Sequence, residues 1–505
     1  MILSKYTLKN ILSEAVTKPD ENVFELPEKV LQFGTGVLLR GLPDYFIDKA
    51  NREGIFNGRI VVVKSTSHGD TSAFDKQDGL YTLCVRGLVN GNKVEENIVN
   101  SSISRVINAQ DGWEQILECA HNQAMQVVIS NTTEVGIQLV NEDIRKHPPT
   151  SFPGKLLAFL FERYTAFGGS EHSGMVIIPT ELIPNNGKKL EAIILELAHL
   201  NSLDDGFIEW LECCNYFCNS LVDRIVPGKP DASMIDDLQS TLGYKDELLT
   251  VSEVYRLWAI EGDETVKNIL SFAKADEGVV ITPDIDLYRE LKLRLLNGTH
   301  TLSCGAAFLA GFETVKEAMD SDSFSNFVSG LMKKEIAPSI PYTIDPLVSQ
   351  EFSTKVLDRF CNPHLKHNWI SITVQYTSKM KLRCIPLLQN HFENANTPLP
   401  LFAFGFAAYL QFMKVTEKRD NKYFGEREGN PYEIVDDSAE YFYKKEQEED
   451  KEAITLSILK DVSFWGSDLT LLPHFADAVL ENQKSIQQNG LKKTIETLQL
   501  KKEMV

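Results

Sequence analysis

Apolar residues in the first 180 positions gather in short runs that are bounded by polar and turn-forming residues. The runs are VLQF at 30–33, RIVVVK at 59–64, MQVVIS at 125–130 and GMVIIP at 174–179. Runs of this length that are rich in Val and Ile are typical of strands buried on both faces of a parallel sheet. Between the first two runs, apolar residues recur at helical spacing from Leu38 to Phe46, which predicts a strand, a turn, a helix and a strand in succession.

The pattern becomes helical after Lys188. LEAIILELAHL at 190–200 and FIEWLECCNYFCNSLVDRIVP at 207–227 both place apolar residues three and four apart, and nearly all of the sequence after Pro283 is predicted to be helical. Two stretches differ: Asn90-Gly91 predicts the turn of a β-hairpin within 81–99, and SITVQYTSKMKLRCIP at 371–386 has β character. At 505 residues, the chain is expected to form an α/β Rossmann-type domain over 1–275 and a mainly α-helical domain over 276–505.

A glycine turn, Gly34-Thr35-Gly36, follows the first predicted strand directly after Phe33. Such a turn lets the backbone approach the pyrophosphate of a dinucleotide, although Leu39 takes the place of the third glycine of the usual motif and a purely structural turn is an equally good alternative. The second strand ends in Lys64-Ser65-Thr66 without a carboxylate to bind the ribose, so this stretch leaves the choice between NAD and NADP open.

A leucine-rich segment, YRELKLRLLNGTHTLSC at 288–304, carries Lys292, Asn297 and His300. In an α-helix, 100° per residue places the three side chains at roughly 0°, 140° and 80°, so they share one face. Polar groups where a core is expected need partners or a function. We interpret this row of polar side chains as a site for acid–base chemistry at a carbonyl. Lys292 would be the general acid and base, and Asn297 and Asn186 would be amide donors to the carbonyl oxygen. The structural alternative is a surface lysine and a hydrogen-bonded core histidine.

Composition excludes several classes of partner. The 71 acidic residues exceed the 51 basic ones and leave a formal charge of −20, which argues against nucleic acid and anionic membranes. An anionic substrate would need a local group of cations, and Lys379, Lys381 and Arg383 form one, although a solvated basic face explains them equally well. No apolar run approaches the roughly 20 residues of a membrane span. The scattered cysteines and the start MILSKYTLKN lead us to expect reduced thiols and a cytoplasmic protein.

Two pairs of residues have the spacing of metal ligands, but neither is complete. Cys214 and Cys218 lack a second liganding pair, and His364 and His367 lack a nearby carboxylate or third histidine. We therefore expect no metal.

Several motifs together resemble the mannitol dehydrogenase family of polyol-specific long-chain dehydrogenases. The pattern Lys292-x4-Asn297-x2-His300 resembles its catalytic signature. The further matching segments are QFGTGVLLRG (32–41), QDGLYTL (77–83), NTTEVG (131–136), IPNNG (183–187), NSLVDRIVP (219–227), RFCNP (359–363) and TSK (377–379). The resemblance covers essentially the whole chain, and the matching segments are most similar to those of the branch that reduces hexuronate-derived ketones.

The resemblance implies an NAD-dependent dehydrogenase of a small sugar acid. Lys292 would be the general acid and base, Asn186 and Asn297 would orient the carbonyl, and His300 and Lys379 would contact the substrate. The cofactor would be bound by Phe33, Gly34, Thr35, Gly36, Arg40 and Glu134. Two positions depart from the polyol enzymes: Arg289 replaces a carboxylate and Ser371 replaces an arginine. An added cation at Arg289 would suit a sugar acid, which is a hypothesis.

Other functions remain open on the sequence alone. A fructuronate reductase or a mannitol-type dehydrogenase would use the same scaffold, since few positions decide the substrate. A nucleotide-sensing protein would keep the cofactor loop, but it has no need of Lys292, Asn186, Asn297 and His300 together. A metal-dependent uronate epimerase would lose activity with a chelator. The oligomeric state is left open.

Overall fold

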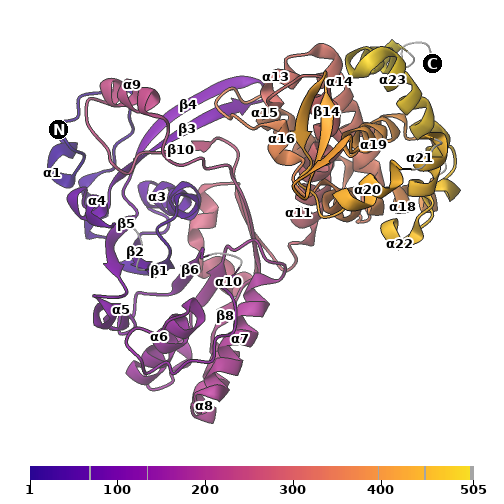
Figure 1. Ribbon diagram of the computed structural model, residues 1–505. Coiled ribbons are helices and arrows are strands. Elements are labelled where there is room, and N and C mark those ends of the chain that lie inside the picture. The colour runs from indigo at the N-terminus through magenta and orange to yellow at the C-terminus, as the bar shows by residue number, and fades with distance from the viewer. Residues whose placement is uncertain (67–69, 133–134, 396, 448–450, 501–505) are drawn as a thin grey trace. The chain divides into compact units, whose positions relative to one another are not determined.

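The protein is described by a computed structural model that covers residues 1–66, 70–132, 135–395, 397–447 and 451–500. It divides into two compact units (Figure 1). The first comprises Met1–Gly87 and Lys93–Ile285, and the second comprises Leu88–Asn92 and Asp286–Val505. Each unit is described separately below.

The first unit is built on a six-stranded sheet in the order β5-β2-β1-β6-β7-β8, in which all neighbouring strands are parallel. The strands are β1 (Glu28–Phe33), β2 (Arg59–Lys64), β5 (Ile103–Asn108), β6 (Val127–Ser130), β7 (Val176–Pro179) and β8 (Tyr216–Phe217). This order confirms the Rossmann-type prediction. From β1 the chain adds β2 and β5 on one side, and from β6 it adds β7 and β8 on the other side. Ligands of such sheets bind at this change in strand order, between β1 and β6, beyond the carboxyl ends of the strands.

Helices cover both faces of this sheet (Figure 1), which explains the apolar runs at the centres of β1, β2, β6 and β7. Leu31 and Phe33 of β1 belong to one core, with residues of α6, α7 and α8, while Val30 belongs to a second core with residues of α3. The helices of the unit are α1 (Lys5–Leu8), α2 (Val37–Gly41), α3 (Pro43–Arg52), α4 (Ser72–Lys76), α5 (Trp113–Cys119), α6 (Phe152–Ala166), α7 (Asn186–Leu200), α8 (Asp205–Cys214), α9 (Ala232–Leu242) and α10 (Glu264–Ile269), with short 3₁₀ turns η1 (Glu21–Glu25), η2 (Glu171–Ser173) and η3 (Ser271–Ala275).

Two smaller sheets complete the unit. The predicted hairpin is confirmed as β3 (Tyr81–Val89) and β4 (Asn92–Asn100), with Asn90 at φ 51° and Gly91 at φ 76°, and it joins β10 (Thr250–Glu253). The other sheet contains β9 (Ser220–Asp223), β11 (Leu257–Glu261) and β12 (Val279–Thr282).

The prediction of a helix over 207–227 is wrong beyond Cys214, because α8 ends there and β8 and β9 follow. Asn215 explains the change. Its backbone is extended, at φ −112° and ψ 148°. Its side chain donates to the Trp210 carbonyl at 3.0 Å and accepts from the Met175 amide at 3.0 Å, so it ends the helix and holds the start of β8 beside β7.

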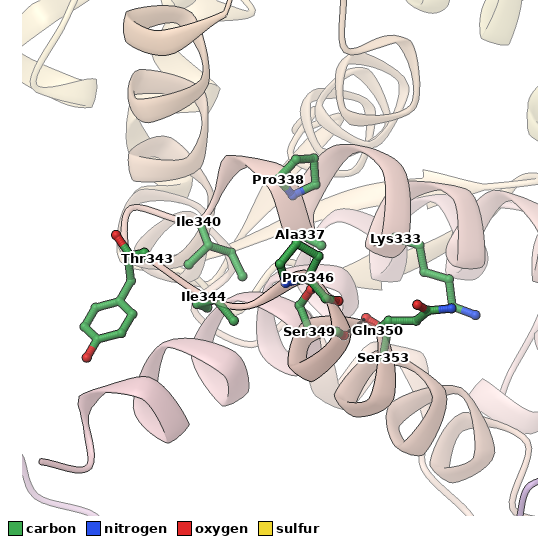
Figure 2. Close-up of a pocket in the computed structure, with 11 residues that line it drawn as sticks. Lys333, Ala337, Pro338, Ile340, Thr343, Ile344, Pro346, Ser349, Gln350 and Ser353 are labelled. Carbon is green, nitrogen blue, oxygen red and sulfur yellow. Dashed lines mark hydrogen bonds between the residues drawn. The ribbon is translucent and has the colours of Figure 1, made fainter.

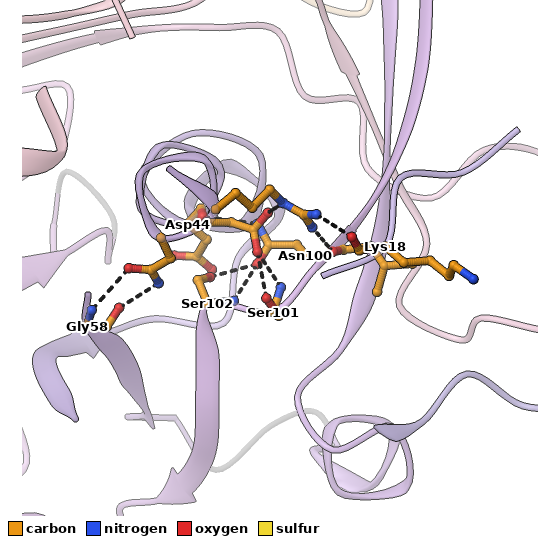
Figure 3. A network of polar contacts seen from close by, with 10 residues as sticks. Lys18, Asp44, Gly58, Asn100, Ser101 and Ser102 are labelled. Atoms are coloured by element: carbon orange, nitrogen blue, oxygen red, sulfur yellow. Dashed lines mark hydrogen bonds and ion pairs between the residues drawn. The ribbon is translucent and has the colours of Figure 1, made fainter. Parts of the chain in front are cut away.

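A polar network fixes α3 within the first unit (Figure 3). Asp48 accepts from the Ser101 amide at 2.7 Å and pairs with Arg52 at 2.7 Å, and Arg52 donates to the carbonyl of Lys18 at 2.8 Å. One turn earlier, Asp44 is fully buried. Burial raises the pKa of the Asp44 carboxyl to about 8.

The raised pKa of Asp44 predicts how stability depends on pH. Between an unfolded pKa near 3.8 and a folded pKa of about 8, the folded state binds one more proton. Asp44 therefore contributes stability that is present at low pH and is lost as the pH rises towards 8, by up to about 1.4 kcal/mol per pH unit. We expect Asp44→Asn to remove this slope in urea unfolding measured from pH 5 to 8.5. The exposed control Asp236→Asn should keep it, and parallel curves for wild type and Asp44→Asn would contradict the assignment.

The second unit is mainly helical, as predicted. Its helices are α11 (Asp286–Glu290), α12 (Thr299–Leu309), α13 (Val315–Met319), α14 (Asp322–Gly330), α15 (Pro346–Phe360), α16 (Trp369–Ile372), α17 (Tyr376–Lys379), α18 (Ile385–Asn394), α19 (Pro400–Phe412), α20 (Ala439–Lys445), α21 (Lys451–Leu459), α22 (Val462–Trp465) and α23 (Phe475–Leu500), with π-helices η4 (Leu291–Gly298), η5 (Leu331–Ile336) and η7 (Met380–Cys384) and 3₁₀ turns η6 (Ala337–Ser339) and η8 (Leu469–Leu471). The buried helix α12 packs against α19. Gly405 permits this approach, because a Cβ there would lie 2.6 Å from the Leu302 carbonyl oxygen.

The β character predicted for 371–386 is wrong, since this stretch forms α16, α17, η7 and the start of α18. Its buried residues Ile372, Tyr376, Met380 and Cys384 recur every four positions and continue from Trp369 just before it, which is the helical period. The strands of this unit lie elsewhere, in the antiparallel sheet of β13 (Glu417–Arg419), β14 (Lys422–Arg427) and β15 (Asn430–Glu433). Across the residues described, no helix has the length and apolar character to span a membrane.

Candidate active site

The segment that carries Lys292, Asn297 and His300 is helical, but its centre is a π-helix. The chain runs from α11 through η4 into α12 without interruption. In a π-helix residue i bonds residue i+5, so Lys292 and Asn297, five apart, lie closer together around the helix axis than the 140° that an α-helix gives. Both side chains are half-buried. The π-helix thus brings the ammonium and the amide together on one face.

A second π-helix, η7, packs against η4. Arg294 of η4 joins them: it donates to the carbonyls of Leu382 at 2.7 Å and Arg383 at 2.9 Å, and it pairs with Glu290 at 2.9 Å. Arg294 is buried, so these bonds are shielded from water. The two irregular helices therefore hold each other in place, and the residues that they carry form one region.

The two asparagines of the predicted site differ in what they bind. The Asn297 side-chain amide forms no hydrogen bond with any residue that the structure describes, so it is available to a ligand. Asn186, in the first unit, is 1% exposed. It donates to the carbonyls of Pro179, Glu181 and Ser220 at 3.0, 3.0 and 3.1 Å, and it accepts from the amides of Gly187 and Ser220, both at 2.9 Å. Its amide is fully used inside the protein.

His300 is buried with a ring nitrogen that has no partner. Its ring stacks on Phe360 with centroids 4.1 Å apart, and His367 and Trp369 meet it edge-on at 5.2 and 6.0 Å. Among the residues described, none bonds its Nε2 atom. Burial, followed by the nearby His367 and then by the charges of Arg359, Arg383 and Lys379, lowers the pKa of His300 well below its usual range. His300 is therefore neutral at pH 7, and an unpaired buried Nε2 calls for a ligand group.

Lys379 and Arg383 belong to the same region and act on His300 through their charges, as does Arg359. Lys379 donates to the carbonyl of Ile372 at 2.9 Å, and burial, with Arg383 next, lowers the pKa of Lys379. Arg383 lies against α12: its Nη1 atom is 3.2 Å from Thr301 Oγ1 and 3.4 Å from the Asn297 carbonyl. The region is electropositive, although the whole chain is acidic.

The other cations that the sequence singled out are engaged elsewhere. Arg289 pairs with Asp286 on its own helix, which neutralises the charge that the sequence offered for a sugar acid. Lys381 lies over the ring of Phe464, with its Nζ atom 3.7 Å from the centroid. Ser371, which replaces the family's arginine, is exposed.

In the first unit, the glycine turn lies at the point where the strand order reverses. Gly34 has φ +132°, and a Cβ there would lie 2.9 Å from the Asn131 carbonyl oxygen, so this position demands glycine. A Cβ at Gly36 would meet nothing within 4 Å. Phe33 is buried beneath the turn, while Thr35 is partly exposed. Open space over the backbone is what a bound pyrophosphate needs.

The remaining cofactor candidates are placed less favourably. Arg40 is buried, its guanidinium lies near the rings of Phe74 and Tyr81, and it donates to the carbonyl of Leu248 at 2.5 Å. Glu134 lies outside the described residues. At the end of β2, the Lys64 ammonium donates a hydrogen bond to the Thr66 carbonyl at 2.5 Å.

The sequence assigned no individual role to Glu181, which lies in the turn that follows β7 and binds residues at the end of β6. This buried carboxylate accepts from the Thr132 amide at 2.8 Å, the Thr132 hydroxyl at 3.0 Å and the Ser130 hydroxyl at 3.1 Å. Its place directly after an apolar strand was the available signal. In the part of the chain that the structure describes, no group of three His, Cys, Asp or Glu side chains could hold a metal ion.

A separate pocket of about 520 Å³ lies in the second unit and is not part of this site (Figure 2). Pro338, Ile340, Ile344 and Pro346 form much of its wall, with Lys333 at one end. The residues that line it include no carboxylate and no imidazole. It therefore lacks the acid–base groups that the candidate site combines.

Comparison with known proteins gives matches along nearly the whole chain. Residues 28–274 match the mannitol dehydrogenase Rossmann domain, and residues 284–487 match the mannitol dehydrogenase C-terminal domain. Altronate oxidoreductase of Bacillus subtilis is 38% identical over 488 residues, which is 95% of this chain and 98% of that protein. Altronate oxidoreductase of Yersinia enterocolitica is 35% identical, over 93% of this chain and 96% of that protein.

Two solved structures share the fold. Mannitol 2-dehydrogenase of Pseudomonas fluorescens, in a ternary complex with NAD and D-mannitol, has a TM-score of 0.66 at 22% identity and covers 99% of this chain and 100% of its own. A D-sorbitol dehydrogenase in substrate-free form has a TM-score of 0.76 at 21% identity and covers 98% and 100%. At these identities, the likeness concerns the fold alone.

Proposed function

Because the chain belongs to the mannitol dehydrogenase family, we propose that it is an oxidoreductase that interconverts altronate and tagaturonate with NAD(H) in the cytoplasmic breakdown of galacturonate. The names of the relatives support the substrate. One structural observation carries the chemistry: Lys292 and Asn297 lie one π-helical turn apart, and the neutral His300 follows on the next helix.

When bound, the nicotinamide supplies or takes the hydride, and the residues of the chain manage the proton and the substrate oxygen. Lys292 donates a proton to the ketone oxygen during reduction and takes it back from the alcohol during oxidation. Asn297 donates an amide hydrogen bond to the same oxygen, since no described residue uses that amide. His300 binds a substrate hydroxyl through Nε2, and Lys379 is a second substrate contact.

For Asn186 the resemblance proposes an amide that orients the carbonyl. Its five buried hydrogen bonds support a different contribution, in which it holds the end of β7, the start of β9 and the start of α7 in place. We therefore propose Asn186 as a positioning residue.

The turn Phe33–Gly36 is the proposed seat of the pyrophosphate, with Arg40 supporting it from within the unit. The open space over Gly36 fits this cofactor, and the closed space at Gly34 gives a matched contrast. We expect Gly36→Val to raise the dissociation constant for NADH at least about tenfold with an unchanged melting temperature, because the new side chain fills the cradle. Gly34→Ala should instead lower the unfolding free energy by about 1–3 kcal/mol through backbone strain. NADH fluorescence titration measures the dissociation constants, and thermal unfolding measures the stabilities. Wild-type NADH affinity in Gly36→Val would contradict this pyrophosphate site.

Product identification tests the reaction itself. The purified protein is incubated with excess NADH and tagaturonate until turnover stops, and the products are separated by chromatography against altronate and mannonate standards. We expect one equivalent of altronate per NADH oxidised. Formation of another aldonate, or NADH oxidation without altronate, would refute the proposal.

A further inference from the structure

Arg383 differs from Arg289 and Arg294 because, among the described residues, its charge has no acidic partner. Arg289 pairs with Asp286 and Arg294 pairs with Glu290. Arg383 bonds only a backbone carbonyl and a threonine hydroxyl, and among the described residues it makes no ion pair. A half-buried guanidinium in an acidic chain, left without a carboxylate, is costly unless a ligand supplies one.

The bonds of Arg383 occupy one side of the guanidinium and leave the other side unused. Nη1 makes both contacts, to Thr301 Oγ1 at 3.2 Å and to the Asn297 carbonyl at 3.4 Å. Nε is buried and has no partner among the described residues, and Nη2 makes no bond to them either. Nε–H and the adjacent Nη2–H point the same way and form the fork that binds a carboxylate through two parallel hydrogen bonds.

The position of Arg383 places this fork beside the reacting groups. Its Nη1 contacts fall on the helix that carries Asn297 and His300, and its charge acts on His300. Lys379, on the same stretch, adds a second cation. We propose that Arg383 binds the carboxylate of the substrate through Nε and Nη2 and thereby selects sugar acids over neutral ketoses and polyols. The inference rests on the proposed function, which it deepens by naming the residue that recognises the acid.

Steady-state kinetics with a charged and a neutral substrate test this role. Tagatose carries a hydroxymethyl group where tagaturonate carries its carboxylate. We expect Arg383→Gln to raise KM for tagaturonate by about 10- to 100-fold, the loss typical of a charged hydrogen-bonded pair, with kcat within about threefold of wild type. Activity with tagatose should not fall. Arg383→Lys keeps the charge but loses the two parallel N–H donors, so its KM for tagaturonate should lie between those of wild type and Arg383→Gln.

Lys381→Gln is the matched control, because it removes one positive charge from the same π-helix while its ammonium lies over Phe464. Its KM for tagaturonate should stay within about twofold. An unchanged KM in Arg383→Gln, or an equal loss with tagaturonate and tagatose, would overturn the inference. If Arg383→Gln melts at a lower temperature than wild type, Arg383→Lys decides: a wild-type KM there would also overturn it.

Binding distinguishes this failure from failure of the proposed function. Isothermal titration of altronate into the complex with NADH needs no turnover, and Arg383→Gln should weaken binding by the same 10- to 100-fold factor. If the wild-type protein neither binds altronate nor reduces tagaturonate, the proposed function fails. If wild type does both and Arg383→Gln matches it, only the role of Arg383 fails.

Discussion

We expect the replacement of Lys292 by alanine to lower kcat for the proposed tagaturonate reduction by about 10³-fold, within the range expected when a general acid is lost. The side chain is half-buried and lies on the face that carries Asn297, so its removal takes away the proposed proton donor without opening a core. The melting temperature should therefore stay within a few degrees of wild type. Lys292→Arg should be equally inactive, because a guanidinium does not give up its proton at these pH values.

Stopped-flow NADH oxidation measures the Lys292 effect directly. Lys334→Ala, an exposed lysine of the neighbouring π-helix η5, is the control and should keep wild-type kcat. A Lys292→Ala enzyme within tenfold of wild-type kcat would contradict the assignment of Lys292 as the acid.

Asn186→Ala should destabilise the first unit by about 3 kcal/mol, because it leaves buried partners at β7, β9 and α7 without their hydrogen bonds. Urea unfolding measures the loss, and Lys189→Ala, an exposed change on the same helix, should stay within about 0.5 kcal/mol. A variant with wild-type stability and a large loss of kcat would contradict the positioning role and restore the direct contact with the carbonyl.

The Rossmann half could be predicted from sequence because its strands are buried on both faces. Val30 and Leu31 face opposite cores, so the central strands contain uninterrupted apolar runs that the sequence shows directly. The same logic failed where local context decides. Asn215 ends a helix that the apolar spacing continues, and the β-branched residues of 371–374 masked the helical period of Trp369, Ile372 and Tyr376.

The candidate site shows the same division. Residue types and spacing predicted Lys292, Asn297 and His300, but not the π-helix that aligns the first two. Arg294 of this π-helix bonds the carbonyls of Leu382 and Arg383, and contacts between residues so far apart in the chain cannot be derived from local spacing. Likewise, the sequence grouped Lys379, Lys381 and Arg383 as one basic cluster, and only side-chain contacts separate the cation on Phe464 from the cation with an unused fork.

The central claim is that this protein reduces tagaturonate with NADH, and one measurement tests it most directly. The purified protein is offered tagaturonate, fructuronate and fructose side by side, with NADH and NADPH in parallel, and the absorbance of the reduced nucleotide is followed. We predict turnover with tagaturonate and NADH at a kcat/KM far above that of every other combination. Preference for fructuronate or fructose would contradict the assignment of tagaturonate as substrate while leaving the fold and the roles of the lysine and amide intact. The absence of turnover with all three compounds would favour a protein that binds the nucleotide without catalysis.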